Sequence, residues 1–167
     1  MSLLNYAEEF TNISNTNGIF RQLFQGCTGL LTAPELPATV IPDYAYNYMF
    51  DGCSNLTAVP ELPGLTFGVR SYEYMFQGCS KITNAKIAIS TLDNNWNGFA
   101  NMFRSCSLLS SIEVNFSAWG PGTGTAMNWV QYVAEQGTFI CPTALGTNET
   151  ITRDVNHCPQ NWTVVNK

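Results

Sequence analysis

One pentapeptide occurs four times in this chain of 167 residues, and its regular spacing is the strongest guide to the fold. Successive copies begin 26, 26 and 27 residues apart. The copies are Leu23-Phe24-Gln25-Gly26-Cys27, Met49-Phe50-Asp51-Gly52-Cys53, Met75-Phe76-Gln77-Gly78-Cys79 and Met102-Phe103-Arg104-Ser105-Cys106. Self-similarity at a fixed period of this length is typical of a solenoid, in which each repeat is one supersecondary unit stacked on the next. We therefore expect a solenoid of about four coils.

An aromatic residue precedes the phenylalanine of every copy by four positions, and these are Phe20, Tyr46, Tyr72 and Phe99. Together with the pentapeptide they place apolar residues at offsets i, i+3, i+4 and i+7, which is one face of a short helix. Glycine follows this face in three copies, where a helix commonly ends. The pattern predicts about two helical turns in each repeat.

Short apolar runs follow each pentapeptide, and we expect them to form one strand per coil. The predicted strands are Leu30–Ala33, Leu56–Val59, Ile82–Ile87 and Leu109–Val114. Prolines end the first two, because proline cannot donate a hydrogen bond to a sheet ladder. A helix, a strand and a return loop in about 26 residues is typical of the leucine-rich repeat class. Strands of successive coils would pair in parallel. The predicted fold class is thus an α/β leucine-rich-repeat solenoid with a short helix and a short parallel strand in each coil.

The pattern [FY]-x-x-M-F-x-G-C-S-x-L-T resembles the BspA-like leucine-rich repeats of bacterial surface proteins. The resemblance covers residues 18–114, a little over half of the chain. Thr28-Gly29 departs from it in the first copy and Ser105 in the last. The resemblance implies a repeat protein that is displayed on or secreted from a bacterial cell, with Phe24, Cys27, Phe50, Cys53, Phe76, Cys79, Phe103 and Cys106 as its structural core.

We predict three segments: an N-terminal edge (1–17), the solenoid (18–116) and a C-terminal capping region (117–167). The period of the sequence breaks after Phe116, and strand-like runs follow at 129–133, 137–141 and 162–165. A solenoid needs a cover over its last coil, because an open sheet edge invites aggregation. The cap also resembles the tails of repeat proteins from gut bacteria and their phages.

The composition excludes two classes of partner. With seven Lys and Arg, a formal charge of −5 and a pI near 4.6, the chain is unsuited to nucleic acid, and no basic cluster changes this. No apolar run approaches the ~18 residues that a membrane span requires. The N-terminus has neither a basic region nor an apolar core typical of a signal peptide. We expect a fragment of a longer protein, located outside the cell or on a bacterial surface, or alternatively in a virion.

The four repeated cysteines would form one column, with neighbouring Cα atoms about 5 Å apart. We predict buried free thiols in this column, because free cysteine packs as a small hydrophobic residue. A linear column does not converge on a metal ion, so no metal is expected. Outside the repeat, Cys141 and Cys158 are a candidate disulfide that would close the cap.

Nothing in the chain indicates catalysis, and we predict no enzyme activity and no cofactor. The single histidine, His157, lies in a loop without a matching nucleophile motif. The acidic residues Glu35 and Glu61 occupy equivalent positions of a repeated Pro-Glu-Leu-Pro, so the repeat explains them as a solvated surface row.

Four aromatic residues outside the core pattern are candidate binding residues: Tyr44, Tyr48, Tyr74 and Trp96. Exposed Tyr and Trp favour recognition, because they offer a large contact area at low entropic cost. The alternative is that these rings cover grooves between coils. We expect a non-catalytic protein- or glycan-binding module that serves adhesion or host interaction, or alternatively a structural or receptor-binding part of a phage tail.

Overall fold

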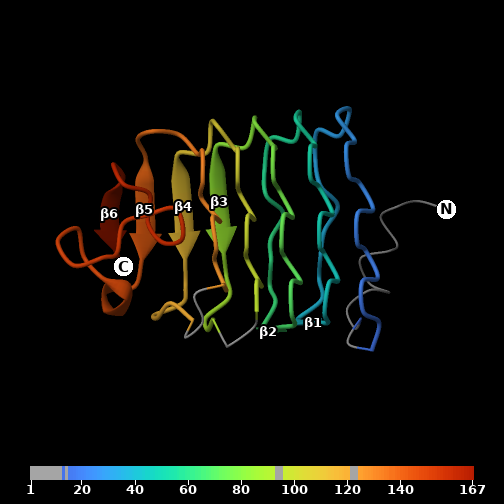
Figure 1. Ribbon diagram of the computed structural model, residues 1–167, viewed down its shortest axis with the longest axis horizontal. Helices are drawn as coiled ribbons and strands as arrows, with labels where there is room; N and C mark the ends of the chain where they lie inside the picture. Colours follow the sequence, from blue (N-terminus) through green and yellow to red (C-terminus); the bar gives the residue numbers. More distant parts are fainter. Residues whose placement is uncertain (1–12, 14, 93–95, 121–123) are drawn as a thin grey trace.

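The computed structural model describes residues 13, 15–92, 96–120 and 124–167, and in them the chain forms a parallel β-solenoid of about four turns. Successive coils lie side by side from the N-terminal end to the C-terminal end (Figure 1). One sheet has two strands, β1 (Val40–Ile41) and β2 (Thr66–Phe67). The other has the order β3-β4-β5-β6. The predicted solenoid with parallel strands is confirmed.

The four-stranded sheet is parallel and is built from one strand per coil. Its strands are β3 (Asn84–Ile87), β4 (Ser111–Val114), β5 (Thr138–Cys141) and β6 (Thr163–Asn166). Register pairs Ala85 with Ile112 and Ile112 with Phe139, so apolar residues of successive coils stack on the inner face. The strands predicted at 82–87 and 109–114 are therefore confirmed, and the sheet continues through β5 and β6 into the region predicted as a cap.

The predicted short helix in each coil is wrong. Within the described residues the only helix assigned is the 3-10 helix η2 (Thr143–Leu145), which lies outside the repeats. The motif segments are instead chains of β-turns. In the second coil Asn47 N–H donates to Tyr44 O, three residues back, whereas Tyr48 N–H donates to Glu73 O in the next coil. Along the segment the backbone N–H groups donate alternately to a carbonyl of their own coil and to a carbonyl of the next coil, so half of these hydrogen bonds connect coils.

Every fourth residue of these turn segments has a positive φ, which an α-helix does not tolerate. In the second coil these residues are Tyr44, Tyr48 and Gly52, with φ of 59°, 57° and 75°. A four-residue turn period places side chains i and i+4 on one face, as a helix does. This coincidence explains why the sequence pattern indicated a helix.

The core consists of columns of identical or similar residues, one from each coil. Phe24, Phe50, Phe76 and Phe103 stack with ring centroids 5.5, 5.4 and 5.7 Å apart. Cys53, Cys79 and Cys106 are buried beside them, as predicted. In the first coil Phe24 is only half-buried and Cys27 is exposed, contrary to the expectation of a buried core position.

The first two coils lack strands at the predicted positions 30–33 and 56–59. Their strands β1 and β2 lie later in the coil, after the Pro-Glu-Leu-Pro segments. The predicted strand at 129–133 is also a turn segment, with Tyr132 at φ 64°. Most of the predicted N-terminal edge, residues 1–12 and 14, lies outside the described residues. No helix of the described part is long and apolar enough to cross a membrane.

Candidate functional site

The chains of β-turns form one side of the solenoid, which we call the turn flank: segments 18–26, 44–52, 70–78, 97–105 and 124–132, with Trp96 directly before the fourth. The positive-φ residues of neighbouring coils form rows along this flank, because hydrogen bonds between coils hold them in register, as in Phe24 N–H to Met49 O and Phe50 N–H to Met75 O. Side chains that occupy the same row in successive coils are therefore neighbours. All four predicted binding residues lie on or beside this flank.

Tyr48 and Tyr74 occupy one such row and pack against each other. Their ring centroids are 4.4 Å apart and the planes are within 10° of parallel. Both side chains are half-buried. Burial, and to a lesser extent the neighbouring Tyr74 side chain, raises the pKa of Tyr48 to about 12. The two rings therefore pack against each other across the second and third coils, and a binding role for them stays a prediction.

Tyr44 and Trp96 are each paired with an arginine. The guanidinium carbon of Arg21 lies 5.9 Å from the Tyr44 ring centroid, and that of Arg70 lies 5.3 Å from the Trp96 ring. Both distances are within cation–π range. Trp96 is 64% exposed, so much of its surface remains open to a ligand.

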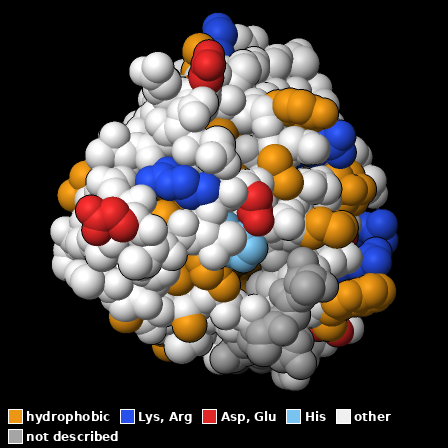
Figure 2. Space-filling model, turned by 60° about the vertical axis from the view of Figure 1, so that its left-hand side comes forward, with side chains coloured by type: hydrophobic (Ala, Val, Ile, Leu, Met, Phe, Trp, Pro, Cys, Tyr) orange, Lys and Arg blue, Asp and Glu red, His pale blue; other side chains and the backbone are white. Residues whose placement is uncertain are grey.

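A third pair of the same kind joins Arg104 to Tyr132, at 5.9 Å, and the Tyr132 side chain is 65% exposed. Three of the four arginines of the chain thus lie over aromatic rings of the turn flank. In Figure 2, basic side chains lie beside hydrophobic ones along the right-hand edge. The sequence pattern did not predict Tyr132 or the arginines as part of the site. The available signal was that Arg70 and Trp96 are 26 residues apart, which is one repeat period and places them in neighbouring coils.

A buried carboxylate sits beneath one of these pairs. Glu73 Oε2 accepts a hydrogen bond of 3.1 Å from Asn47 Nδ2 and lies 3.8 Å from Arg70 Nε, within ion-pair range but beyond hydrogen-bond distance. Burial raises the pKa of Glu73, although Arg70 and Asn47 act in the opposite direction. When Glu73 is ionised, its negative charge balances the positive charge of Arg70.

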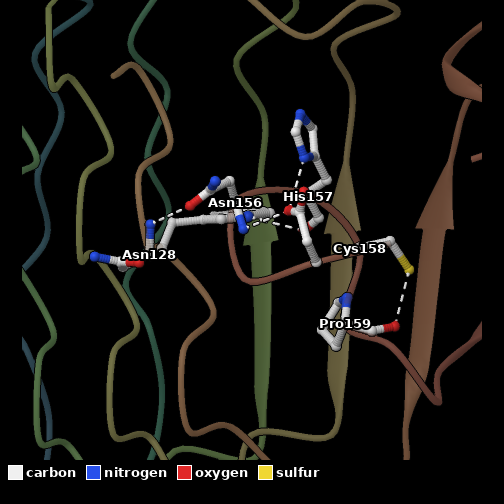
Figure 3. Close-up of polar contacts among 7 residues, drawn as sticks. Asn128, Asn156, His157, Cys158 and Pro159 are labelled. Carbon is white, nitrogen blue, oxygen red and sulfur yellow. Dashed lines mark hydrogen bonds and ion pairs between the residues drawn. The ribbon is translucent and has the colours of Figure 1, made fainter. Parts of the chain in front are cut away.

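The loop after η2 carries the second polar cluster (Figure 3). His157 Nδ1 lies 2.7 Å from Asp154 Oδ1, and the imidazole packs edge-on against Trp119 with centroids 4.8 Å apart. Trp129 Nε1 donates to His157 O at 2.9 Å, and Asn128 N–H donates to Asn156 Oδ1 at 2.7 Å. These bonds fasten the loop to the preceding coil.

The histidine–aspartate pair orients an imidazole, which is one element of a catalytic triad, but the nearest thiol points elsewhere. Cys158 Sγ lies 3.6 Å from Pro159 O and is directed away from the His157 ring (Figure 3). Burial raises the pKa of the Cys158 thiol to about 11, although Arg153 acts in the opposite direction. Among the described residues no three His, Cys, Asp or Glu side chains are placed to hold a metal ion. The hydrogen bonds of the cluster connect this loop to the preceding coil.

Cys141 and Cys158, the candidate disulfide, are both buried free thiols in this structure. Cys141 Sγ lies 3.8 Å from Gly146 O. Formation of a bond between them under oxidising conditions stays a prediction.

Comparisons with protein-family models, with curated proteins and with solved structures found no match.

Proposed function

We propose that this chain is a non-catalytic binding module that recognises protein or glycan through its turn flank, and that it belongs to a bacterial cell-surface or secreted protein with a role in adhesion. The observation that carries the proposal is the set of exposed rings, Trp96 and Tyr132, each held by an arginine. Aromatic and arginine side chains dominate recognition surfaces, because they combine large apolar area with directed hydrogen bonds.

The repeated F-x-G-C-S-x-L motif supports membership of the BspA-like leucine-rich repeat class, and the parallel solenoid is compatible with it. The regular architecture supports a rigid display role. Each coil contributes equivalent surface positions at fixed spacing, so differences in binding arise from residues that vary between coils. Trp96 and Tyr132 are such residues, since the copies before Trp96 have Asp43 and Val69 at its position, and those before Tyr132 have glycine or Ser105.

The test is binding of the fluorescently labelled protein to glycan and protein arrays. We expect the Trp96→Ala/Tyr132→Ala variant to lose most of the array signal of the wild type. The matched control is Leu65→Ala/Leu108→Ala, which removes two exposed apolar side chains elsewhere and should keep that signal. Equal thermal unfolding midpoints would establish that all three proteins are folded. A wild-type protein that binds no array feature, or a ring variant that binds like the control, would reject the proposal.

A further inference from the structure

The first two coils differ from the later ones where the chain runs along the sheet side. They carry Ala33-Pro34-Glu35-Leu36-Pro37 and Val59-Pro60-Glu61-Leu62-Pro63, whereas the next coil has strand β3 in the corresponding stretch. Hydrogen bonds join the two coils on either side of these segments, from Thr57 N–H to Leu31 O and from Leu65 N–H to Thr39 O. Among the described residues no backbone hydrogen bond joins 33–38 to 59–64, and the two prolines of each segment have no N–H to donate.

A groove of about 440 Å³ lies between these two segments. Its walls include Pro34, Glu35 and Leu36 from the first coil and Pro60, Glu61 and Pro63 from the second. We call it the proline groove. Leu36 is buried and forms part of its apolar wall, while the side chains of Glu35 and Glu61 are exposed at equivalent positions of adjacent coils. The groove thus combines a stiff apolar surface with two carboxylates.

Neither carboxylate is neutralised within the described part of the chain. The ion pairs found there involve Glu73, Glu113 and Asp154, and no Lys or Arg side chain pairs with Glu35 or Glu61. Because both ionisable groups of the groove are acidic and the whole chain has a formal charge of −5, the groove attracts cations. Its proline rings suit a ligand whose charge is carried at the end of a methylene stem, since such stems pack on apolar surfaces while the charged head stays near polar groups.

We propose that the proline groove binds a lysine- or arginine-bearing segment of a partner protein. The stem of the basic side chain would lie on the rings of Pro34 and Pro60, and its cationic head would pair with Glu35 and Glu61. This inference names a class of partner for the proposed binding module and rests on that function, but it uses a surface that contains none of the turn-flank residues. Binding at the turn flank and binding at the proline groove can therefore succeed or fail independently.

The test uses the peptide acetyl-(Gly-Lys)3-amide as the probe, with acetyl-(Gly-Gln)3-amide as its uncharged counterpart, in a two-dimensional NMR titration of the ¹⁵N-labelled protein. We expect saturable shifts of the amide signals of Glu35, Leu36 and Glu61 with the lysine peptide only. The Glu35→Gln/Glu61→Gln variant should bind the lysine peptide roughly tenfold more weakly, as expected for the loss of charge-assisted hydrogen bonds.

The matched control is Glu135→Gln/Glu149→Gln, which removes two exposed negative charges outside the groove and should bind the lysine peptide like the wild type. Shifts elsewhere only, equal shifts with the glutamine peptide, or equal weakening in both double variants would overturn the proposal. Array binding that depends on Trp96 and Tyr132 would persist in that case, so the two failures are distinguishable.

Discussion

The Cys79 thiol donates a hydrogen bond to the backbone carbonyl of Phe50 in the preceding coil, at 3.1 Å. The same bond occurs from Cys53 to Phe24 and from Cys106 to Phe76, at 3.0 Å each. Each phenylalanine carbonyl also accepts a hydrogen bond from the backbone N–H of the cysteine three residues later in its own coil. The carbonyl thus accepts two hydrogen bonds, one from its own coil and one from the thiol of the next coil. The repeated cysteine therefore connects coils by a hydrogen bond as well as by packing.

Substitution of Cys79 separates these two contributions. We expect Cys79→Ala to lower the free energy of unfolding by about 1–2 kcal/mol, through lost packing and a lost hydrogen bond. Cys79→Ser should cost less, because its hydroxyl can still donate to Phe50 O. Urea unfolding measures the free energy of unfolding of both variants. The control is Cys27→Ala, a substitution at an exposed cysteine, whose free energy of unfolding should stay within about 0.5 kcal/mol of the wild type. An alanine variant at least as stable as the serine variant would show that volume alone matters.

Thiol labelling should distinguish the first coil from the others. Cys27 is exposed, whereas the other five cysteines are buried. Burial raises the pKa of the Cys53 and Cys79 thiols above its ordinary value. It raises the pKa of the Cys106 thiol to about 12. Little reactive thiolate therefore forms at these three residues. We expect one fast equivalent of reaction with a disulfide reagent at pH 8, and five slow ones that become fast in denaturant. Cys27→Ala should abolish the fast phase; a fast phase that survives it would contradict the burial of the column.

Alkaline pH should destabilise the fold for the same reason. In the unfolded chain these thiols ionise near pH 9, whereas in the folded chain burial holds the pKa of Cys79 and Cys106 well above that value. The stability of the fold is thus unaffected by these thiols below about pH 9, where they are protonated in both states. It falls as the pH rises from there toward the folded pKa, because only the unfolded chain then releases the protons. We expect a loss of about 1 kcal/mol for each such thiol by pH 10. Urea midpoints between pH 7 and 10 provide the measurement. Cys106→Ala should flatten the decline, and midpoints independent of pH would refute the argument.

Much of the fold could be predicted from the sequence, because a fixed period dictates stacked coils, and Ala85 and Ile112 mark the strands of the third and fourth copies. The turn segments could not, since Phe20 and Phe24 are four residues apart both in a helix and in a chain of β-turns. Glycine at 26, 52 and 78 was the available hint, because all three have positive φ. At the candidate site Tyr44 and Trp96 were predicted but Tyr132 and the arginines were not, because pairs such as Arg104 and Tyr132 form only when neighbouring coils are in register.

Ser105 offers a direct test of the turn geometry. It stands where the other three copies have glycine, and its φ of 64° lies in the left-handed region that costs a non-glycine residue about 1 kcal/mol. We expect Ser105→Gly to raise the free energy of unfolding by about 0.5–1 kcal/mol, the relief of strain being partly offset by the greater entropy of glycine in the unfolded chain. The reverse change, Gly78→Ser, should lower it by a similar amount, since φ at Gly78 is 72°. Thermal and urea unfolding measure both changes. Glycine is also favoured just after a helix, so the pair tests the left-handed backbone at these two positions and not the choice between turn and helix. A Ser105→Gly variant less stable than the wild type, or a Gly78→Ser variant more stable than it, would contradict that backbone geometry.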